Sequence, residues 1–317
     1  MHKSLFNEAI IKLIITPAGP ILIKAGEGLA DPTKPDMNFV RTMHHGQEKV
    51  YLPGSSLKGV LRSHCERLAR TVQGKQHLSC NPLHPKESCS EQLNDKSLSA
   101  PLIHQKSCFV CRMFGHTSLA SHFRISDAFP MGDYRTEERN GVAIDRVFGS
   151  VAVGPFNYET VTSGEFQTTL YLKNFSLAQL GLLSLALRDL TAARVRLGFG
   201  KSRGLGAVTA RVNELTLRYP SCALNEGKVQ MPNGYDITDS LVGAGKFIEQ
   251  LVGNGQAAAY GYQANDEVAL EKIAGYGYEP SEWDEPEIRA PRRPGLRECA
   301  TLKGKAACSA STRIPRT

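Results

Sequence analysis

A loop with four glycines lies between a predicted helix and a predicted strand, and this order limits the folds open to the chain. The loop reads LGFGKSRGLGAV and contains Gly198, Gly200, Gly204 and Gly206. It lacks the GxxxxGK[ST] pattern of a Walker loop. A dinucleotide-binding glycine turn follows a strand and precedes a helix, which is the opposite order. The sequence therefore argues against both nucleotide-binding folds.

Two cations inside this glycine loop indicate a ligand. Lys201 and Arg203 stand among glycines, which let a backbone approach a ligand closely and present its N–H groups. We interpret the loop as a contact for a phosphate backbone, made by Gly198, Gly200, Lys201, Arg203 and Gly204. A flexible turn without a ligand is the alternative interpretation.

The segment YLPGSSLKGVLRSHCERLAR predicts a helix with a cationic start. Apolar residues recur at helical spacing from Leu57 to Val72, and Ser55 and Ser56 are suited to cap the helix. A helix start has free N–H groups and the positive end of the dipole, so it attracts phosphate. Lys58 and Arg62 extend this cationic strip by one turn. An ordinary capped surface helix is the alternative.

Strand-like and helix-like stretches alternate over residues 1 to about 217. The predicted strands are AIIKLIIT, GPILIKAG, HFRISDAFP, EFQTTLYLKN and AVTARVNELTLRY, and a second helix is predicted from Leu177 to Val195. A loop is expected from Gly26 to Lys49. The pattern fades from about residue 220. The last thirty or so residues are basic and poor in large apolar side chains, which predicts a disordered tail.

The composition limits partners and compartment. The 317 residues carry a formal net charge of +7 and include eight cysteines. A positive excess suits a polyanionic partner but does not establish one by itself. We find no run of about 18 apolar residues and expect no membrane partner. Eight cysteines without an export signal favour metal binding or free thiols over disulfides, so we expect a cytoplasmic protein.

A Cys/His-rich, strand-poor insertion spans about residues 74–115. Its spacing is C-x8-C-x18-C-x2-C, given by Cys80, Cys89, Cys108 and Cys111. The CxxC half lets two thiolates reach one tetrahedral Zn²⁺, and a segment so poor in apolar residues needs such a cross-link to become ordered. The first pair is widely spaced, so one histidine is an alternative ligand: His77, His84 or His104. Free thiols in a disordered loop are the other interpretation.

Taken together, these motifs resemble one known family. The PGSSLKG helix start, the segments RISDAFP and AIDRVFGSVAVGPFNYETVTSGEFQTTLYL, and the loop GFGKSRGLG occur in the order typical of the RAMP superfamily of CRISPR proteins. The resemblance covers roughly residues 8–217, and the chain looks like the backbone subunit of type III effector complexes. It implies an α+β, ferredoxin-like, RRM-related βαββαβ fold in residues 1–220. A zinc-binding insertion, a thumb β-hairpin over about 143–168 and an extension over 221–317 complete the expected organisation.

Subunits of this family stack along a guide RNA and hold it by its backbone, for which phosphate and 2′-OH contacts suffice. The resemblance therefore implies guide contacts from the PGSSLKG helix start and from the glycine loop. Arg146, in AIDRVFG, matches the family's Asp-Arg position that opens the thumb, a wedge that displaces one target base. A salt bridge with Asp145 or another surface carboxylate is the alternative. The expected partners are guide RNA, complementary target RNA and neighbouring CRISPR effector subunits.

In this family an aspartate in the loop before PGSSLKG is needed to cleave target RNA. Here the loop DPTKPDMNFVRT holds Asp31 and Asp36, and PDMNFVRT matches the family pattern of Asp followed by an apolar-Arg pair. The resemblance thus implies Asp36 as the catalytic residue of an endoribonuclease. It also implies Mg²⁺ or another divalent ion, which neutralises charge as the 2′-OH attacks. Asp31 precedes Pro32 and is interpreted as a turn residue.

Three other functions stay open from the sequence. In the first, the same backbone subunit is purely structural and Asp36 is a solvated loop carboxylate. In the second, the chain is a RAMP-type endoribonuclease that processes precursor guide RNA by histidine chemistry. In the third, it is an unrelated zinc-containing nucleic-acid-binding protein, and the position of the glycine loop counts against that interpretation.

Overall fold

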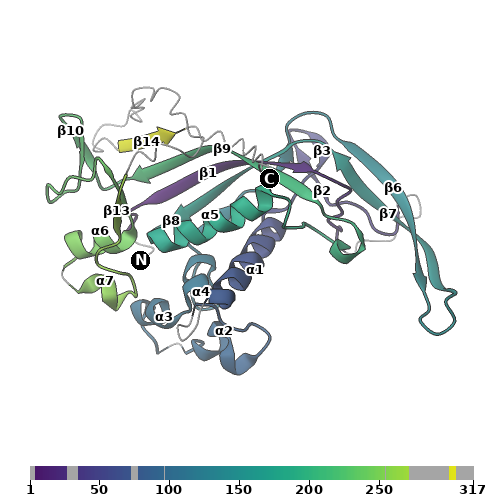
Figure 1. The fold of residues 1–317 in the computed structure, drawn as a ribbon, viewed down its shortest axis with the longest axis horizontal. Helices are drawn as coiled ribbons and strands as arrows, with labels where there is room; N and C mark the ends of the chain where they lie inside the picture. The colour runs from purple at the N-terminus through teal and green to yellow at the C-terminus, as the bar shows by residue number, and fades with distance from the viewer. Residues whose placement is uncertain are drawn as a thin grey trace, which may run out of the picture.

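The structure, a computed structural model, describes residues 4–26, 35–72, 78–95, 97–253 and 255–270 and the backbone of 300–304. Its centre is a six-stranded sheet in which every pairing is antiparallel (Figure 1). The strand order is β14-β9-β1-β8-β4, and the short β5 also pairs with β8. The strands are β1 (Glu8–Pro17), β4 (Phe123–Ile125), β5 (Phe129–Pro130), β8 (Phe166–Lys173), β9 (Val208–Tyr219) and β14 (Ala300–Gly304).

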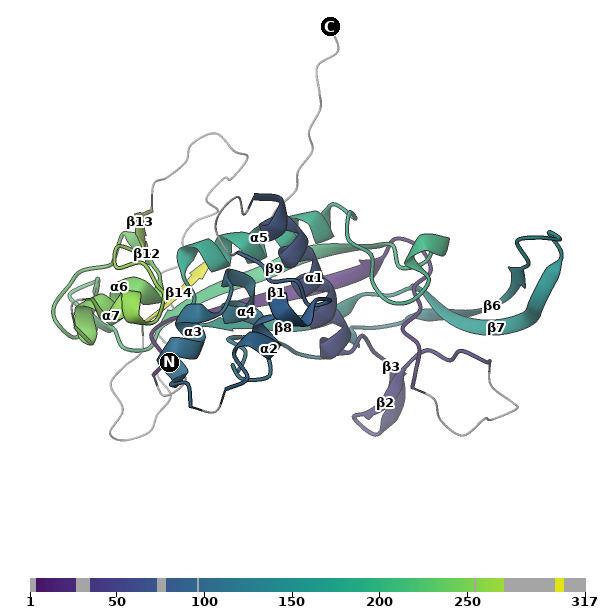
Figure 2. The same cartoon turned by 90° about the horizontal axis from the view of Figure 1, so that it is seen from below.

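Two helices cover one face of this sheet. They are α1 (Gly54–Val72) and α5 (Leu177–Thr191), which lie in front of the strands in the view from below (Figure 2). Along the chain the core elements follow the order β1, α1, β4, β8, α5, β9, and β1 and β8 lie between β9 and β4 in the sheet. This βαββαβ arrangement is compatible with the ferredoxin-like α+β fold expected from the sequence.

The central strand and the second helix form where the sequence predicts them. β1 is the strand between β8 and β9, and Ala9, Leu13 and Ile15, at alternate positions on one face of it, are fully buried. α5 begins with a capping box, in which the Ser176 hydroxyl accepts from the Gln179 N–H and the Gln179 side chain accepts from the Ser176 N–H. The helix ends at Thr191, before the predicted end at Val195.

α1 begins at Gly54, earlier than predicted, and its buried side differs in part from the apolar pattern. Leu57, Leu61 and Cys65 are buried as expected, but Val72 is 73% exposed. The buried side also includes His64 and Glu66, two polar residues. His64 bonds to Asp189 of α5, whereas Glu66 accepts from Arg62 and Arg70 of α1 itself, so polar contacts as well as apolar spacing determine which side of the helix faces the core.

The segment GPILIKAG is not the strand that its apolar residues predict. Ile21 and Lys24 form only isolated bridges, to Val161 and Phe39 respectively. The segment therefore connects β1 to the root of a hairpin instead of adding a strand to the sheet.

The loop predicted from Gly26 to Lys49 contains a hairpin, formed by β2 (Arg41–His44) and β3 (Gln47–Val50). His45 and Gly46 at its turn both have positive φ, 51° and 76°, as in a type I′ turn. Arg41 anchors the hairpin through two guanidinium bonds to Glu159, of 2.7 and 2.6 Å. Burial opposes the charged form of Glu159, but the bonds from Arg41 keep the pKa of this carboxyl below its usual value.

A second, longer hairpin extends beyond the end of the sheet (Figure 1). It consists of β6 (Arg135–Ile144) and β7 (Val151–Ser163). The hairpin begins before the predicted bound of about 143 and ends before β8, which the predicted range to 168 partly included. Arg146 consequently lies in the turn at the tip and not at the start of the hairpin.

The insertion between α1 and β4 is built from short helical elements, as its strand-poor sequence suggests. They are η1 (Pro85–Glu87), α2 (Cys89–Gln92), α3 (Ala100–Lys106) and α4 (Phe109–Phe114). His77, one of the alternative metal ligands, lies outside the described residues.

Residues after β9 form a second, smaller core where the sequence showed no clear pattern. Phe247 stacks on Tyr219 and on Phe6, with ring centroids 5.6 and 6.3 Å apart. The elements of this part are β10 (Ala223–Asn225), β11 (Lys228–Gln230), β12 (Ser240–Val242), α6 (Ala244–Leu251), α7 (Gln256–Ala259) and β13 (Glu267–Ala269). Phe6 comes from the N-terminal segment, so the C-terminal extension packs on the first domain.

The extension also contacts the cysteine-rich insertion. The Tyr260 carbonyl lies 2.7 Å from His104 Nδ1, the Ala258 carbonyl accepts from Gln105 at 3.0 Å, and the Gly261 carbonyl accepts from Arg112. These contacts cross the predicted boundary at residue 220. Within the predicted disordered tail, Ala300–Gly304 forms β14 beside β9, and the other residues beyond 270 lie outside the described part of the chain.

None of the helices in the described residues has both the length and the apolar character needed to span a bilayer.

Candidate nucleic-acid interface and metal centre

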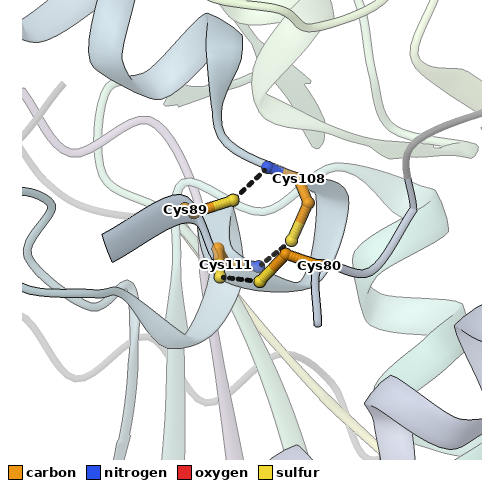
Figure 3. A group of neighbouring side chains, drawn as sticks. All are labelled: Cys80, Cys89, Cys108 and Cys111. Atoms are coloured by element: carbon orange, nitrogen blue, oxygen red, sulfur yellow. Dashed lines mark hydrogen bonds between the residues drawn. The ribbon is translucent and has the colours of Figure 1, made fainter. Parts of the chain in front are cut away.

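Four cysteine side chains of the insertion point toward one another (Figure 3). Their Sγ atoms all lie within 4.8 Å of one another, and Cys80, Cys89, Cys108 and Cys111 are all buried. Two backbone N–H groups donate to sulfur within the cluster, from Cys108 to Cys89 and from Cys111 to Cys108. The CxxC pair meets because Cys108 caps α4 and Cys111 lies in its first turn.

The sulfur positions fit a tetrahedral metal. Zn–S bonds of about 2.3 Å at tetrahedral angles separate two sulfurs by about 3.8 Å. The Cys80 and Cys111 Sγ atoms are 3.7 Å apart, much farther than the ~2.05 Å of a disulfide. The cluster could thus hold a metal such as zinc with four sulfur ligands. No histidine belongs to this group of described residues, and His104 Nδ1 instead meets the Tyr260 carbonyl.

Without an ion, two of the four sulfurs favour the thiolate form. Hydrogen bonds from the Cys108 and Cys111 side chains lower the pKa of Cys89 to about 6 and also lower the pKa of Cys80, whereas the side-chain hydrogen bonds within the cluster, together with burial, raise the pKa of Cys111 and Cys108. Arg62 adds a cation, with Nη2 3.4 Å from the Cys111 sulfur. A positive group beside the sulfurs suits a tetrathiolate site, whose net charge with Zn²⁺ is negative.

Arg62 and Lys58 face the insertion, which corrects the expectation that they form one strip with the two serines. Arg62 donates to Glu66 at 2.9 Å and to the Gly115 carbonyl at 3.0 Å. Lys58 donates to the Ser121 hydroxyl at 2.8 Å, and burial lowers its pKa. Positions two apart on a helix point about 200° from each other, so Lys58 cannot share the direction of Ser56.

The start of α1 already has a carboxylate partner. Asp127 accepts from the Gly54 N–H at 2.7 Å and so takes the capping role that the sequence suggested for the serines. Ser55 and Ser56 lie in the first turn of the helix instead. Both line an open groove beside α1, so they face a different surface from Lys58 and Arg62.

This groove, of about 730 Å³, lies between the N-terminal part of α1 and the segment that leads into the glycine loop. Five cations line it: Lys24, Arg67, Arg194, Arg196 and Lys201. No acidic side chain is among the described residues that line it. We therefore define the cationic groove by these five residues together with Ser55 and Ser56. An open polar surface with excess positive charge is suited to a phosphate backbone.

The glycine loop owes part of its composition to packing. Gly198 has φ +78°, and a Cβ at this position would collide with the Leu22 carbonyl. The same carbonyl accepts from the Phe199 N–H at 2.7 Å. Gly198 is therefore required by the close approach of two chain segments, and its backbone does not need a ligand to explain it.

The rest of the loop carries the two predicted cations in different directions. Gly200 and Gly204, with φ of 68° and 86°, flank the single turn η2 (Lys201–Arg203). Lys201 lines the cationic groove. Arg203 lies over the Phe199 ring at 4.9 Å and lines a smaller neighbouring pocket. The two cations of this short motif thus reach two different surfaces.

Three groove arginines were missed from the sequence. Arg194 and Arg196 alternate directly before the glycine loop in the segment RVRLGFGK, and counting cations on both sides of the loop would have found them. Arg67 lies eleven positions after Ser56, close to three helical turns, and therefore on the same side of α1. Helical spacing from Ser56, rather than from Lys58, selects this residue.

The outer part of the β6–β7 hairpin exposes apolar side chains. These are Val142, Ile144, Val147, Phe148, Val151 and Val153, with 47 to 84% of each exposed. Such a patch on a protruding element marks a contact surface. The Asp145 carboxylate accepts from the Val147 and Phe148 N–H groups, which lowers its pKa. Arg146 is exposed, and the described residues contain no ion pair between it and Asp145, whose partners are these two N–H groups.

Asp36 is held at the root of this hairpin. Its Oδ2 accepts from the Asn157 N–H of β7 at 2.9 Å, and the adjacent Met37 exchanges backbone bonds with Asn157 and Glu159. The side chain is otherwise exposed. Asp31 lies outside the described residues. The structure thus places the predicted catalytic carboxylate where the loop before α1 meets the hairpin.

A small aromatic pocket adjoins this position. It measures about 190 Å³, and Met37, Phe156, Tyr158, Phe199 and Arg203 contribute to its walls. Met37 follows Asp36 in the chain, and Phe199 also lines the cationic groove. The groove, the pocket and the root of the hairpin therefore form one continuous region.

The described residues do not build a magnesium site at Asp36. The one group of three or more potential metal ligands found among them is the cysteine cluster.

Comparison with known protein families identifies the family of the chain. The family model of the RAMP superfamily matches residues 15–209, which contain the end of β1, the whole of α1, the cysteine cluster, the β6–β7 hairpin and the glycine loop. The chain belongs to the RAMP superfamily. No curated protein matches it.

Membership of the RAMP superfamily implies involvement in CRISPR-associated, RNA-binding complexes, and hence RNA and CRISPR proteins as partners. Some RAMP proteins are RNA endonucleases. The match also rejects the alternative that the chain is a zinc-containing nucleic-acid-binding protein unrelated to this family.

Proposed function

We propose that this RAMP protein is a guide-RNA-binding backbone subunit of a type III CRISPR effector complex that cleaves complementary target RNA. The observation that carries the proposal is the cationic groove, which adjoins the glycine loop and the root of a protruding hairpin. Its partners are then the guide RNA, the target RNA and neighbouring effector subunits.

In this proposal the cationic groove holds the guide by its phosphates. Its cations come from three separate parts of the chain, represented by Lys24, Arg67 and the Arg194–Lys201 segment. The serine hydroxyls beside them can accept or donate to phosphate and ribose oxygens. Because such contacts do not read bases, any guide sequence is held equally, and base pairing with the target supplies specificity.

The β6–β7 hairpin serves as the thumb, the wedge that displaces one target base from the duplex. Its exposed apolar tip suits contact with unstacked bases, because removing both apolar surfaces from water is favourable in free energy. Arg146 at the tip adds a charge for the backbone that passes there. The aromatic pocket at the root, with Phe156 and Tyr158, offers ring surfaces for a displaced base.

Asp36 takes the catalytic role in the proposed cleavage of the target. Cleavage of RNA by its own 2′-OH needs that hydroxyl, the phosphorus and the leaving oxygen in line, and it needs a group that accepts the hydroxyl proton. The Asn157 N–H engages one carboxylate oxygen and fixes the side chain, which leaves the other oxygen for this task. The dependence on a divalent ion rests on the family resemblance alone.

A second candidate function is a backbone subunit without catalysis. The bond between Asp36 and the Asn157 N–H is consistent with it, because this contact gives the carboxylate a structural use that does not require catalysis. The two candidates predict the same guide binding and differ only in the fate of the target. The substitutions of Asp36 that are described in the Discussion distinguish them.

The cysteine cluster holds a structural Zn²⁺ in this proposal. Cys80, Cys89, Cys108 and Cys111 supply four thiolates, and the ion cross-links parts of the insertion that are far apart in the chain. The ion contributes folding energy and no chemistry at the RNA. It supports the groove indirectly, because Arg62 joins the cluster to α1.

Removing two groove cations should weaken RNA binding at every sequence alike. We expect a Lys24→Gln/Lys201→Gln double variant to bind single-stranded RNA about 10-fold less tightly. The slope of log K against log salt should flatten by about 0.7 for each lost phosphate contact. Fluorescence anisotropy with several unrelated RNA sequences over a range of salt concentrations measures both quantities.

Lys58→Gln is the matched control, because Lys58 carries the same charge but donates to Ser121. This variant should leave the salt slope unchanged. A loss that depends on RNA sequence, or an equal effect of Lys58→Gln, would contradict the assignment of the groove. RNA that copurifies with the native complex should carry repeat-derived tags when sequenced, whereas cellular RNA without such tags would reject the guide-binding function.

A further inference from the structure

A buried histidine connects the two walls of the cationic groove. His64 lies on the inner side of α1 opposite the last turn of α5 and is 8% exposed. Its Nε2 is 2.8 Å from Asp189 Oδ2, and its Nδ1 is 2.9 Å from Arg67 Nη2. Neither the CRISPR resemblance nor the glycine loop accounts for this side chain.

The partners of His64 determine where its proton is. A guanidinium has N–H donors and no acceptor, so Nδ1 must present its lone pair to Arg67. Nε2 then carries the hydrogen and donates to the Asp189 carboxylate. The ring is therefore neutral and in the Nε2–H tautomer, because a protonated ring would turn an N–H toward the donor of Arg67.

The same carboxylate holds the opposite wall of the groove. Asp189 Oδ1 accepts from Arg194 Nη1 at 3.1 Å, and Arg188 Nη2 lies 3.5 Å from it. A chain of hydrogen bonds thus leads from Arg67 through His64 and Asp189 to Arg194. Both terminal arginines line the groove, one from α1 and one from the segment after α5.

We propose that His64 is a positioning residue of the RNA-binding groove. It orients the Arg67 side chain without neutralising its positive charge. The inference rests on the proposed function and deepens it. A direct carboxylate partner would fix a guanidinium but would also cancel much of its charge. A neutral imidazole acceptor fixes Arg67 and leaves its full positive charge for a phosphate. Asp189 is thereby kept for Arg194 and for the ring.

The consequence is a preorganised cation. A long arginine side chain loses conformational freedom when it binds, and prior fixation reduces this cost. His64 should therefore affect affinity for RNA although it contacts none. Its effect should require Arg67 and should depend on an acceptor at the Nδ1 position.

The test uses the full-length chain and a fluorescein-labelled single-stranded polyuridine RNA. His64→Leu removes both ring nitrogens, and we expect about 10-fold weaker binding. His64→Gln keeps one acceptor and one donor and should bind within about 3-fold of wild type. Thermal melting and metal content monitor the fold of each variant. A folded His64→Leu variant with wild-type affinity, or a Gln variant as weak as the Leu variant, would overturn the proposal.

A double-mutant cycle separates positioning from general packing. If His64 acts through Arg67, then His64→Leu should add nothing to the loss already caused by Arg67→Ala. Additive losses would show that His64 supports the groove by some other route and would reject the proposal.

The tautomer can be measured without any substitution, which matters if His64→Leu does not fold. Long-range ¹H–¹⁵N spectra of the wild-type chain should show Nδ1 of His64 unprotonated near neutral pH. An Nδ1–H tautomer would refute the inference. If the wild type binds no RNA but shows the expected tautomer, the proposed function fails while the Arg67 contact stands.

Discussion

Cys108→Ser should remove the metal from the protein and lower the free energy of unfolding by roughly 4 kcal/mol or more, the range that accompanies loss of a structural metal. For a chain of this size the melting temperature should fall by about 10 °C. The expected cause is the loss of a cross-link between parts of the insertion that are far apart in the chain. Metal analysis, thermal melting and limited proteolysis measure the three effects.

The damage should extend beyond the cluster. His104 and Arg112 of the insertion contact Tyr260 and Gly261 of the C-terminal extension, so a loosened insertion loses these bonds as well. Proteolysis should therefore cut the insertion, about residues 74–115, first and the extension soon afterwards. Cuts that remain confined to the extension would contradict this order.

Cys65→Ala is the matched control, because Cys65 is a buried free thiol on α1 outside the cluster. It should cost about 1 kcal/mol, as a small truncation in a core does, and keep the metal. The zinc assignment would be wrong if freshly purified protein, prepared without chelators, contained no zinc. It would also be wrong if Cys65→Ala released as much metal as Cys108→Ser.

The sequence predicted those features that depend on local pattern. β1, α1 and α5 follow from hydrophobic periodicity, and the four cysteines follow from their spacing and from the chemistry of zinc. The cysteines could be named because thiolates have few other uses in a segment of this composition. The structure agrees because each of these features is decided by residues close together in the chain or by one strong chemical preference.

Features that depend on distant partners were missed. Lys58 and Arg62 look equivalent to Arg67 along the sequence, but Ser121 and the cysteine cluster attract the first two, whereas His64 holds the third. The C-terminal core was invisible because its strands are three residues long and one of its rings, Phe6, comes from the other end of the chain. Neither the partners of these cations nor the C-terminal core produces a periodic pattern in the sequence.

Asp36→Ala should leave guide binding and assembly intact but reduce cleavage of complementary target RNA by on the order of 10²-fold or more, as expected for loss of a group that transfers a proton. Guide binding should survive because the cationic groove is built from other segments and does not require Asp36. The measurement is a gel of labelled target RNA incubated with complexes that contain wild-type or variant subunits.

The bond to Asn157 makes a second substitution necessary. Alanine removes both the charge and the acceptor for the Asn157 N–H, so lost cleavage could reflect a displaced hairpin root. Asp36→Asn keeps an oxygen that can accept this bond and removes only the charge. If Asp36 is catalytic, both variants should fail to cleave. If it only supports β7, the asparagine variant should cleave like wild type.

Two further comparisons complete the experiment. Asp31→Ala, in the same loop, and Asp239→Asn, an exposed carboxylate of the C-terminal extension, should both be close to neutral. Cleavage by the wild-type complex should need a divalent ion and recur at a regular spacing, because each stacked subunit displaces one target base. Unchanged cutting by both Asp36 variants would reject Asp36 as the catalytic residue, and loss only with Asp31→Ala would move the catalytic role to that residue. Absence of regularly spaced cutting by the wild-type complex would support the non-catalytic alternative. A defect in all four variants would instead point to damaged assembly, since Asp239 belongs to the C-terminal extension and has no role in the proposed cleavage.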